Sequence, residues 1–173
     1  MDDSLEWFER LYDTYYLNVM RYALQHAEQG HAEDVVSETF LVAWRRRADI
    51  PEPPLPWLLG VARNLLRKQA DKARHRQLIT DRIAAMTDDR DLLAWDTADH
   101  VIERTTALRA LAALPDADVE ALTLITWHGL SPAEAATVLG CSTHAFTTRL
   151  HRARHRLDDL LAKENDVTPT LKG

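Results

Sequence analysis

The sequence predicts an all-α protein made of two small helical domains that are joined by a flexible acidic linker, with a helix-turn-helix in the second domain. Apolar residues recur at helical spacing in every long periodic segment, and no segment sustains the alternation of a β-strand. Glycine is scarce, with five in 173 residues, which favours long helices. The charge changes sign along the chain, and this change marks the division into two domains.

The first domain is expected to contain three helices. The first covers about residues 5–28, and its broad apolar face consists of Trp7, Phe8, Leu11, Tyr12, Tyr15, Val19 and Leu24. The second covers about residues 32–47 and places Val36, Phe40 and Ala43 on its apolar side. The third covers about residues 57–76. Four of the seven prolines lie in the loop at 49–56, which is expected to be extended because proline disfavours helix at and before its own position.

Overall charge at first argues against a nucleic-acid partner, because the net charge is −6 and the pI is about 5.7. The charges are not evenly spread, however. Residues 63–76 hold six basic residues and one acid, whereas residues 88–120 hold nine acids and three arginines. A second basic segment follows near the end of the chain. This pattern indicates two nucleic-acid surfaces joined by a segment that avoids or imitates DNA.

The helix-turn-helix lies in residues 130–157. Ser131, Pro132 and Glu134 form a helix start of the capping-box type, Gly140 supplies a left-handed helix end, and Ser142 can cap a second helix after a short turn. On this second helix the stripe facing the core consists of Phe146, Leu150, Ala153, Leu157 and Leu160. The outward face and its flank carry donors that suit a major groove: His144, Thr147, Thr148, Arg149, His151, Arg152, His155 and Arg156. The alternative is a solvated amphipathic helix with an accidental basic run.

Several other classes of protein are disfavoured. The chain has no glycine-rich phosphate loop, no paired acid and base in an apolar setting and no nucleophile with a suitable partner, so we expect no enzyme and no cofactor. His151 and His155 have helical spacing but lack a third ligand, so no metal site is predicted. The single Cys141 fits a reducing cytoplasm. An acidic start and the lack of a long apolar run argue against export and against direct membrane insertion.

The order of these motifs resembles regions two and four of an extracytoplasmic-function (ECF) RNA polymerase sigma factor. The segments that carry the resemblance are AEDVVSETFLVAWRR, PWLLGVARNLLRKQADKARHR, ALRALAALPDADVEAL and RLHRARHRL. The resemblance implies a subunit that binds core RNA polymerase and directs it to promoter DNA with a minus-thirty-five and a minus-ten element. It divides the chain into region two at 1–76, a linker at 77–104, region four at 105–161 and a disordered tail at 162–173. The resemblance implies that the linker enters the RNA-exit path, and the alternative is an ordinary flexible linker with solubilising charge.

The resemblance also implies where the polymerase docks. The surface of the second helix that would meet the clamp-helices coiled coil of the largest polymerase subunit consists of Asp34, Ser37, Glu38 and Leu41. Acids around an apolar centre would face basic side chains of the polymerase. The alternative is that Asp34 and Glu38 are only solvated, or that Glu38 pairs with Arg45 along its own helix. Family members often carry glutamine at the position of Ser37.

Melting of the minus-ten element requires a pocket for an extruded base and a basic wall for the single strand. In ECF sigma factors the loop that corresponds to 49–56 holds the flipped base. The residues assigned to the minus-ten DNA are Asp49, Trp57, Arg63, Asn64, Arg67, Lys68, Lys72, Arg74 and Arg76. The loop segment PEPPLP offers no side-chain amide or hydroxyl, so selectivity would rest on backbone groups and on Asp49 or Glu52. Trp57 is equally well interpreted as a core anchor.

The remaining partners follow from the same resemblance. The outward face of the second region-four helix would read the minus-thirty-five element, and many relatives are held by an anti-sigma factor, which makes such an inhibitor a candidate partner here. A different class stays open on the residues alone, namely a two-domain helix-turn-helix regulator that binds duplex DNA without core polymerase, usually as a dimer.

Overall fold

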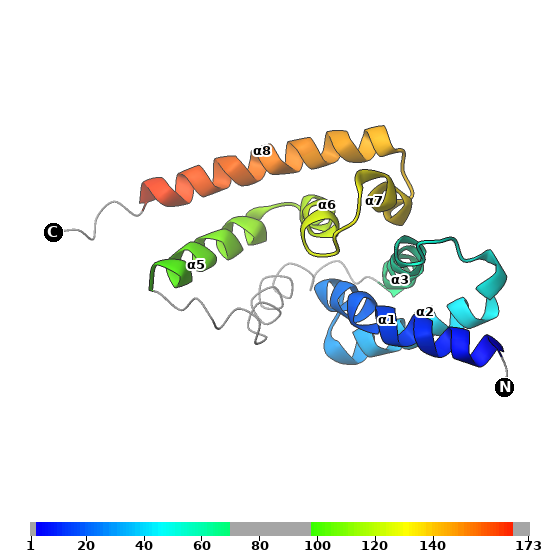
Figure 1. Cartoon of the computed structure of the whole chain (residues 1–173). Helices are drawn as coiled ribbons and strands as arrows, with labels where there is room; N and C mark the ends of the chain where they lie inside the picture. The colour runs from blue at the N-terminus through cyan, green and yellow to red at the C-terminus, as the bar shows by residue number, and fades with distance from the viewer. Residues whose placement is uncertain (1–2, 70–97, 168–173) are drawn as a thin grey trace.

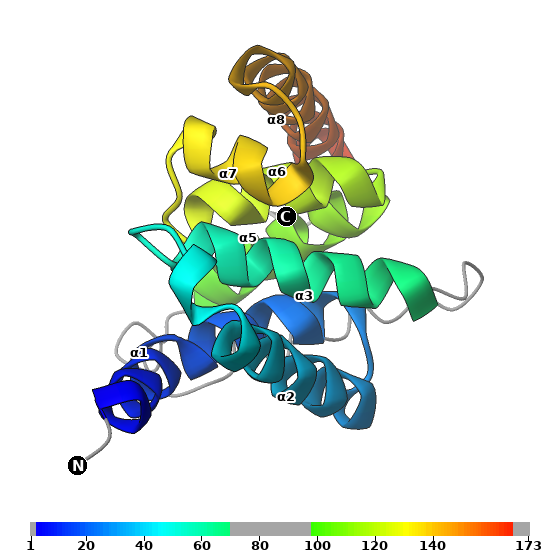
Figure 2. The same ribbon diagram turned by 90° about the vertical axis from the view of Figure 1, so that its right-hand side faces the viewer.

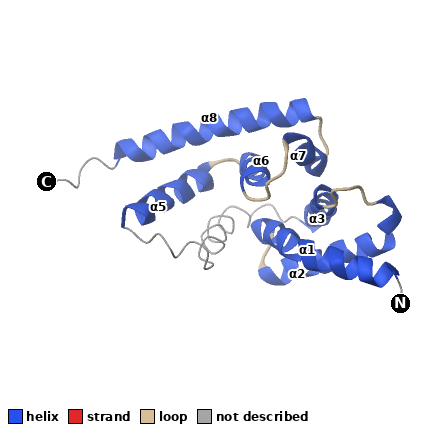
Figure 3. Ribbon diagram, in the orientation of Figure 1, coloured by secondary structure: helices blue, strands red, loops and turns tan. Residues whose placement is uncertain are grey.

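The computed structural model describes residues 3–69 and 98–167, and every regular element in these two ranges is a helix (Figures 1 and 3). The first domain contains α1 (Asp3–His26), α2 (Gln29–Arg45), the short 3-10 helix η1 (Arg47–Asp49) and α3 (Leu55–Gln69). The second contains α5 (Ala98–Ala113), α6 (Asp116–Thr126), α7 (Pro132–Leu139) and α8 (Thr143–Val167). The predicted all-α class with a helix-turn-helix is therefore confirmed.

The three helices of the first domain pack around a core whose members were mostly predicted. Val36, Phe40 and Ala43 of α2 are buried, as expected for one face of an amphipathic helix. On α1, Leu11 and Val19 are buried, and the other predicted residues are half-buried except Tyr12, which is 38% exposed. Tyr22 and Ala23 of α1 and Leu58 and Leu59 of α3 complete the core.

The proline-rich loop is shorter than the sequence predicts, because α3 begins at Leu55 and not at Trp57. The amide of Leu58 donates to the carbonyl of Pro54 at 3.0 Å, so Pro56 lies in the first turn of the helix. Proline is tolerated there because the amides of the first turn have no partner within the helix. Residues 70–76, the expected last part of this helix, lie outside the described residues.

The predicted helix-turn-helix is confirmed in its local chemistry. The hydroxyl of Ser131 accepts the Glu134 amide at 3.3 Å, while the Glu134 carboxylate accepts the Ser131 amide at 2.7 Å. Gly140 ends α7 with φ +66°, which is the left-handed conformation that favours glycine. The hydroxyl of Ser142 accepts the Ala145 amide at 3.1 Å at the start of α8. These contacts satisfy helix-end amides and set the sharp crossing of α7 and α8.

Helix α8 packs through the expected stripe, because Phe146, Leu150 and Ala153 are buried and Leu157 and Leu160 are half-buried. Two predicted boundaries are wrong. The sequence predicts residues 98–104 to be part of the flexible linker, but they begin α5, and it predicts residues 162–167 to be part of a disordered tail, but they continue α8. Helix α5 lies along α8 and contacts it, and half-buried leucines on both helices pack against the core (Figure 1). Residues 77–97 of the linker lie outside the described residues.

The two domains are not separate bodies in this structure. Helix α7 packs against α3, and the buried residues of both domains belong to one continuous apolar cluster. Seen from the side, α3 lies between the α1–α2 pair and the helices of the second domain (Figure 2). In the described part of the chain, no helix is both long enough and apolar enough to span a membrane.

Candidate nucleic-acid interface

The outward face of α8 is open to solvent. His144, Thr147, His151 and Arg152 are exposed, and Thr148 and Arg149 are half-buried at the edge of the same face. The Thr147 hydroxyl donates to the His144 carbonyl at 3.0 Å, which orients this side chain along the helix. Because the apolar stripe is buried on the other side, α8 presents donors in one direction, as a helix in a major groove must.

Arg156 at the flank of this face has an internal partner. Its guanidinium forms an ion pair with the buried carboxylate of Asp118 on α6, while 52% of the Arg156 side chain stays exposed. A buried carboxylate requires such a partner. This pair holds α8 against α6, and the assignment of Arg156 to minus-thirty-five DNA stays a prediction.

The histidines of α8 do not form a metal site together with other ligands. The rings of His151 and His155 meet edge to face with centroids 4.5 Å apart. Within residues 3–69 and 98–167, no three side chains of histidine, cysteine, aspartate or glutamate gather in a group that could hold a metal ion.

The four residues assigned to polymerase docking share one exposed face of α2. Asp34, Ser37 and Glu38 are exposed, and 47% of the apolar Leu41 side chain is open to solvent. Among the described residues neither acid takes part in an ion pair, and the alternative pairing of Glu38 with Arg45 is not formed. Both carboxylates are therefore available to a partner.

The residues assigned to the minus-ten element separate into distinct environments. Asp49, Asn64, Arg67 and Lys68 are exposed, and Asp49 forms a surface ion pair with Arg46 at 3.5 Å. Trp57 is half-buried and packs against the core, which favours the interpretation as a core anchor. Lys72, Arg74 and Arg76 lie outside the described residues.

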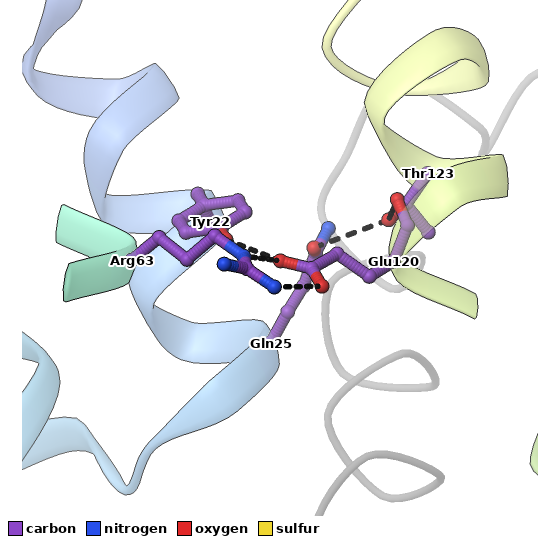
Figure 4. Close-up of polar contacts among 5 residues, drawn as sticks. All are labelled: Tyr22, Gln25, Arg63, Glu120 and Thr123. Atoms are coloured by element: carbon purple, nitrogen blue, oxygen red, sulfur yellow. Dashed lines mark hydrogen bonds and ion pairs between the residues drawn. The ribbon is translucent and has the colours of Figure 1, made fainter. Parts of the chain in front are cut away.

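Arg63 differs from the others because it belongs to a polar cluster between the domains, shown in part in Figure 4. Its Nε donates to Oε1 of Glu120 at 2.9 Å, and its Nη2 donates to Oε2 at 3.4 Å. The hydroxyl of Tyr22 donates to the same Oε1 at 2.6 Å. We call this cluster the domain junction, and its members are Tyr22, Gln25, Arg63, Glu120, Thr123 and His128.

The ionisation of the Glu120 group is set by its surroundings. Burial alone would raise the pKa of Glu120, but the charge of His26 and the hydrogen bonds from Arg63 and Tyr22 outweigh it and lower the pKa. Burial, together with the neighbouring carboxylate, raises the pKa of Tyr22 well above its ordinary value of 10.0. Tyr22 therefore stays a donor and Glu120 stays an acceptor at neutral pH.

The second half of the junction joins Gln25 to α6 and to the loop that follows it. The Thr123 hydroxyl donates to Oε1 of Gln25 at 3.4 Å, and Nε2 of Gln25 lies 3.4 Å from Nε2 of His128. Because an amide nitrogen can only donate, the His128 Nε2 must be unprotonated. Burial, with further effects of the charges of His26 and Arg21, lowers the pKa of His128 to about 4, which agrees with a neutral ring.

Sequence reasoning missed most of this cluster. The sequence counts Asp118 and Glu120 among the acids of a segment that avoids or imitates DNA, but it does not indicate that both are buried and paired with arginines. The position of Tyr22 three residues after Val19 on the apolar side of α1 was the available signal for its burial. Nothing in the local sequence distinguishes Glu120 from its solvated neighbours.

The neutral His128 makes stability depend on pH. Its pKa in the fold lies below the ordinary value of 6.5, so the unfolded chain binds a proton that the folded chain rejects. This contribution to stability is complete above pH 6.5 and is lost as the pH falls toward 4, at about 1.4 kcal/mol per unit. Between pH 7 and pH 5 the free energy of unfolding of the wild type is expected to fall by about 2 kcal/mol more than that of His128→Gln, as measured by urea unfolding. Equal losses in the two proteins would contradict the assignment. Glu120, whose pKa is lowered, contributes stability that is fully present above its ordinary value of 4.5 and is lost only as the pH falls below it, so its contribution does not change between pH 7 and pH 5.

Comparison with known proteins agrees with this arrangement. Residues 11–76 match the model of sigma-70 region 2, and residues 104–157 match that of sigma-70 region 4. The ECF RNA polymerase sigma factor SigL of Mycobacterium tuberculosis is 33% identical over 150 residues, which cover 83% of this chain and 82% of the relative. A probable RNA polymerase sigma factor of Xanthomonas campestris, RfaY, is 36% identical over 141 residues, which cover 79% of this chain and 35% of that protein.

A solved structure extends the agreement to the fold. The structure of CnrH in complex with the cytosolic domain of CnrY matches with a TM-score of 0.63 at 26% identity and covers 90% of this chain and 88% of CnrH. Two sigma-70 regions in this order, together with the match to SigL over most of both chains, show that this protein belongs to the ECF family of RNA polymerase sigma factors.

Proposed function

We propose that this sigma factor binds core RNA polymerase through α2, reads a minus-thirty-five element with α8 and engages a melted minus-ten element with α3 and the loop that precedes it. The observation that carries the proposal is the exposure of two chemically different faces, one acidic and apolar on α2 and one rich in donors on α8. Each face lies opposite a buried stripe that fixes its direction. The proposal includes no catalytic activity and no cofactor.

The α2 face suits a basic protein partner with an apolar centre. Asp34 and Glu38 lie about two turns and one turn before the exposed Leu41 on the same face of α2. Basic side chains of a partner can replace the water that these carboxylates lose on association. Ser37 is small and leaves this face accessible. The partner in this proposal is the clamp-helices coiled coil of the largest polymerase subunit.

The α3 face suits a single strand of DNA. Asn64, Arg67 and Lys68 are exposed along one helix and can contact successive phosphates. The loop before α3 supplies backbone groups for an extruded base, and Asp49 stands exposed beside it. Lys72, Arg74 and Arg76 extend the same basic segment in the sequence and belong to the proposal on that ground alone.

A further proposed partner is an anti-sigma factor. CnrH, which this chain resembles in fold and at 26% identity, is described in complex with the cytosolic domain of CnrY. An inhibitor of this kind would cover the faces that this sigma factor uses for the polymerase. We place the protein in the cytoplasm, in keeping with the single Cys141 and with these partners.

Arg152 is expected to read a base rather than to clamp a phosphate. It is exposed on α8 and carries no ion pair within the described residues. Loss of a bidentate arginine–guanine contact costs about 1–3 kcal/mol at one position, whereas a lost phosphate contact weakens all sequences alike. Binding-site selection with holoenzyme that contains Arg152→Ala should therefore show relaxed preference at one position of the minus-thirty-five element.

The control for this experiment is Arg154→Ala, which removes an exposed arginine of the same helix outside the predicted reading set. It is expected to keep the preferred sequence. An unaltered preference in the Arg152→Ala holoenzyme, with weaker binding throughout, would make Arg152 a phosphate clamp.

The whole proposal is tested by run-off transcription with purified core polymerase, this protein and genomic promoter fragments. Transcripts that start at defined sites and require the protein are the expected result. Duplex DNA binding by the protein alone, with no transcript from any fragment, would contradict the proposal and favour a regulator that acts without core polymerase.

A further inference from the structure

The domain junction contains a charge pair whose basic member belongs to the predicted DNA surface. Arg63 lies on α3, between the exposed Asn64 and the buried Ala62, and only 18% of its side chain is accessible. Its partner Glu120 comes from α6 of the other domain and is 9% exposed. Figure 4 shows the carboxylate facing the guanidinium while Tyr22 approaches from the same side. The second domain therefore covers one cation of the first.

The geometry of this pair imitates a phosphate contact. Arg63 uses Nε and Nη2 to reach the two oxygens of one carboxylate, which is the two-pronged arrangement that guanidinium also forms with phosphate. A nucleic-acid phosphate and Glu120 therefore compete for the same donors. The neighbouring Arg67 and Lys68 remain exposed. The closed arrangement therefore makes Arg63 inaccessible to DNA but leaves these two cations of α3 accessible.

The packing around the pair is suited to separation. A pocket of about 180 Å³ lies at the junction, lined by Tyr22, His26, Arg63 and Arg67 on one side and by Asp116 and Glu120 on the other. A buried ion pair stabilises an interface weakly, because both ions regain their hydration when the interface opens. Tyr22, Arg63 and Glu120 can all bind water after separation. The ion pair therefore opposes separation only weakly, and the apolar packing of α7 on α3 supplies the rest of the closure.

The faces that recognise the other proposed partners are not covered. Asp34, Glu38 and Leu41 on α2 are exposed in the closed arrangement, as are His151 and Arg152 on α8. The second domain opposes α3 through α6 and α7, and it meets α1 at Tyr22 and Gln25. The closed chain can therefore meet core polymerase first and give up the junction afterwards.

We propose that Glu120 is an internal competitor for the minus-ten strand: its carboxylate occupies Arg63 in the closed chain, and a DNA phosphate takes its place when the two domains separate. This inference rests on the proposed function of α3. It assigns Glu120 and Tyr22 a regulatory role, because Tyr22 holds the carboxylate in the position that Arg63 requires.

The first test measures single-strand binding by the full chain. The probe is a fluorescein-labelled 20-nucleotide oligo-dT, followed by fluorescence anisotropy at low salt, where phosphate contacts are strongest. Glu120→Gln is expected to raise the affinity for oligo-dT about tenfold. This factor corresponds to the lower end of the free energy of a hydrogen bond to a charged group. Arg63→Ala combined with Glu120→Gln should not show this gain. Glu9→Gln, with the same charge change at an exposed position of α1, should match the wild type.

The second test measures opening directly. Donor and acceptor dyes at Gln29→Cys on α2 and Thr137→Cys on α7, in a Cys141→Ser background, report the distance between the domains. Both dye positions are exposed. Energy transfer is expected to fall in Glu120→Gln and to stay high in Glu9→Gln. Tyr22→Phe, which keeps the packed ring and removes only the hydroxyl, should lower the energy transfer as well. This variant tests the same contact if Glu120→Gln does not fold.

The outcomes separate this inference from the proposed function. Unchanged oligo-dT affinity in Glu120→Gln and Tyr22→Phe, including no binding by any variant, would overturn the competitor role while run-off transcription by the wild type still supports the proposed function. Opening without a gain in affinity would show that Glu120 closes the domains but does not mask Arg63. Absence of transcripts with the wild type would refute the proposed function itself, whatever the dyes report.

Discussion

The double substitution Glu38→Lys and Leu41→Ala is expected to weaken binding of the chain to core RNA polymerase by about 100-fold or more. Both side chains are exposed on α2, so the change does not touch the buried stripe of Val36, Phe40 and Ala43. The lysine would repel a basic partner, and the alanine removes the apolar centre of the contact. Loss of one partner of an interfacial charge pair costs about 2–5 kcal/mol, and each 1.4 kcal/mol is a factor of ten.

The measurement is a quantitative pull-down with purified core enzyme, accompanied by circular dichroism of the free variant. The matched control is Glu9→Lys with Leu17→Ala, which makes the same chemical changes at two exposed positions of α1. The control is expected to bind as the wild type does. Undiminished binding by the α2 variant would place the polymerase contact on another face of the first domain.

Phe146→Ala is expected to lower the free energy of unfolding by about 3–5 kcal/mol, the usual cost of emptying a buried phenylalanine site. Phe146 is fully buried at the first turns of α8, where the helix crosses α6 and α7. The capped turn around Gly140 holds the backbone there, so the neighbours can close the cavity only in part. Native domains have a total stability of only about 5–15 kcal/mol. The loss is therefore a large share of the total stability, and it should raise the unfolded fraction and weaken minus-thirty-five binding near physiological temperature.

Urea unfolding followed by circular dichroism measures this effect. Leu17→Ala removes a large apolar side chain from an exposed site of α1 and is expected to change stability by less than about 0.5 kcal/mol. If Phe146→Ala were as mild as this control, α8 would be held by other contacts, such as the ion pair between Arg156 and Asp118.

The domain junction links the stability of the second domain to the exposure of Arg63 on α3. Because the apolar clusters of the two domains are continuous, loss of packing in the second domain also weakens its hold on α3. A destabilised α8 should therefore increase the exposure of Arg63 even while it removes the reading face for duplex DNA. Binding of oligo-dT and binding of a minus-thirty-five duplex are expected to change in opposite directions in a mildly destabilised variant.

Local chemistry determined much of this protein directly from its sequence. The capping residues Ser131, Glu134 and Ser142 and the left-handed Gly140 define the helix-turn-helix, because each satisfies or terminates backbone groups only a few residues away. The apolar stripes of α2 and α8 follow in the same way from helical periodicity, and with them the direction of the exposed faces that hold the predicted polymerase and duplex contacts.

Only the tertiary structure decided which charged residues face solvent and which face each other. Glu120 and Asp118 look like their acidic neighbours in the sequence, yet the packing of α6 brings one to Arg63 of the other domain and the other to Arg156 of α8. The sequence pattern likewise did not indicate that α5 begins at Ala98 or that α8 continues to Val167, whereas in the structure the two helices pack against each other. The partners in these two ion pairs are 57 and 38 positions apart in the sequence, so their contact depends on how the helices cross. The periodicity of a single helix does not determine how it crosses another helix.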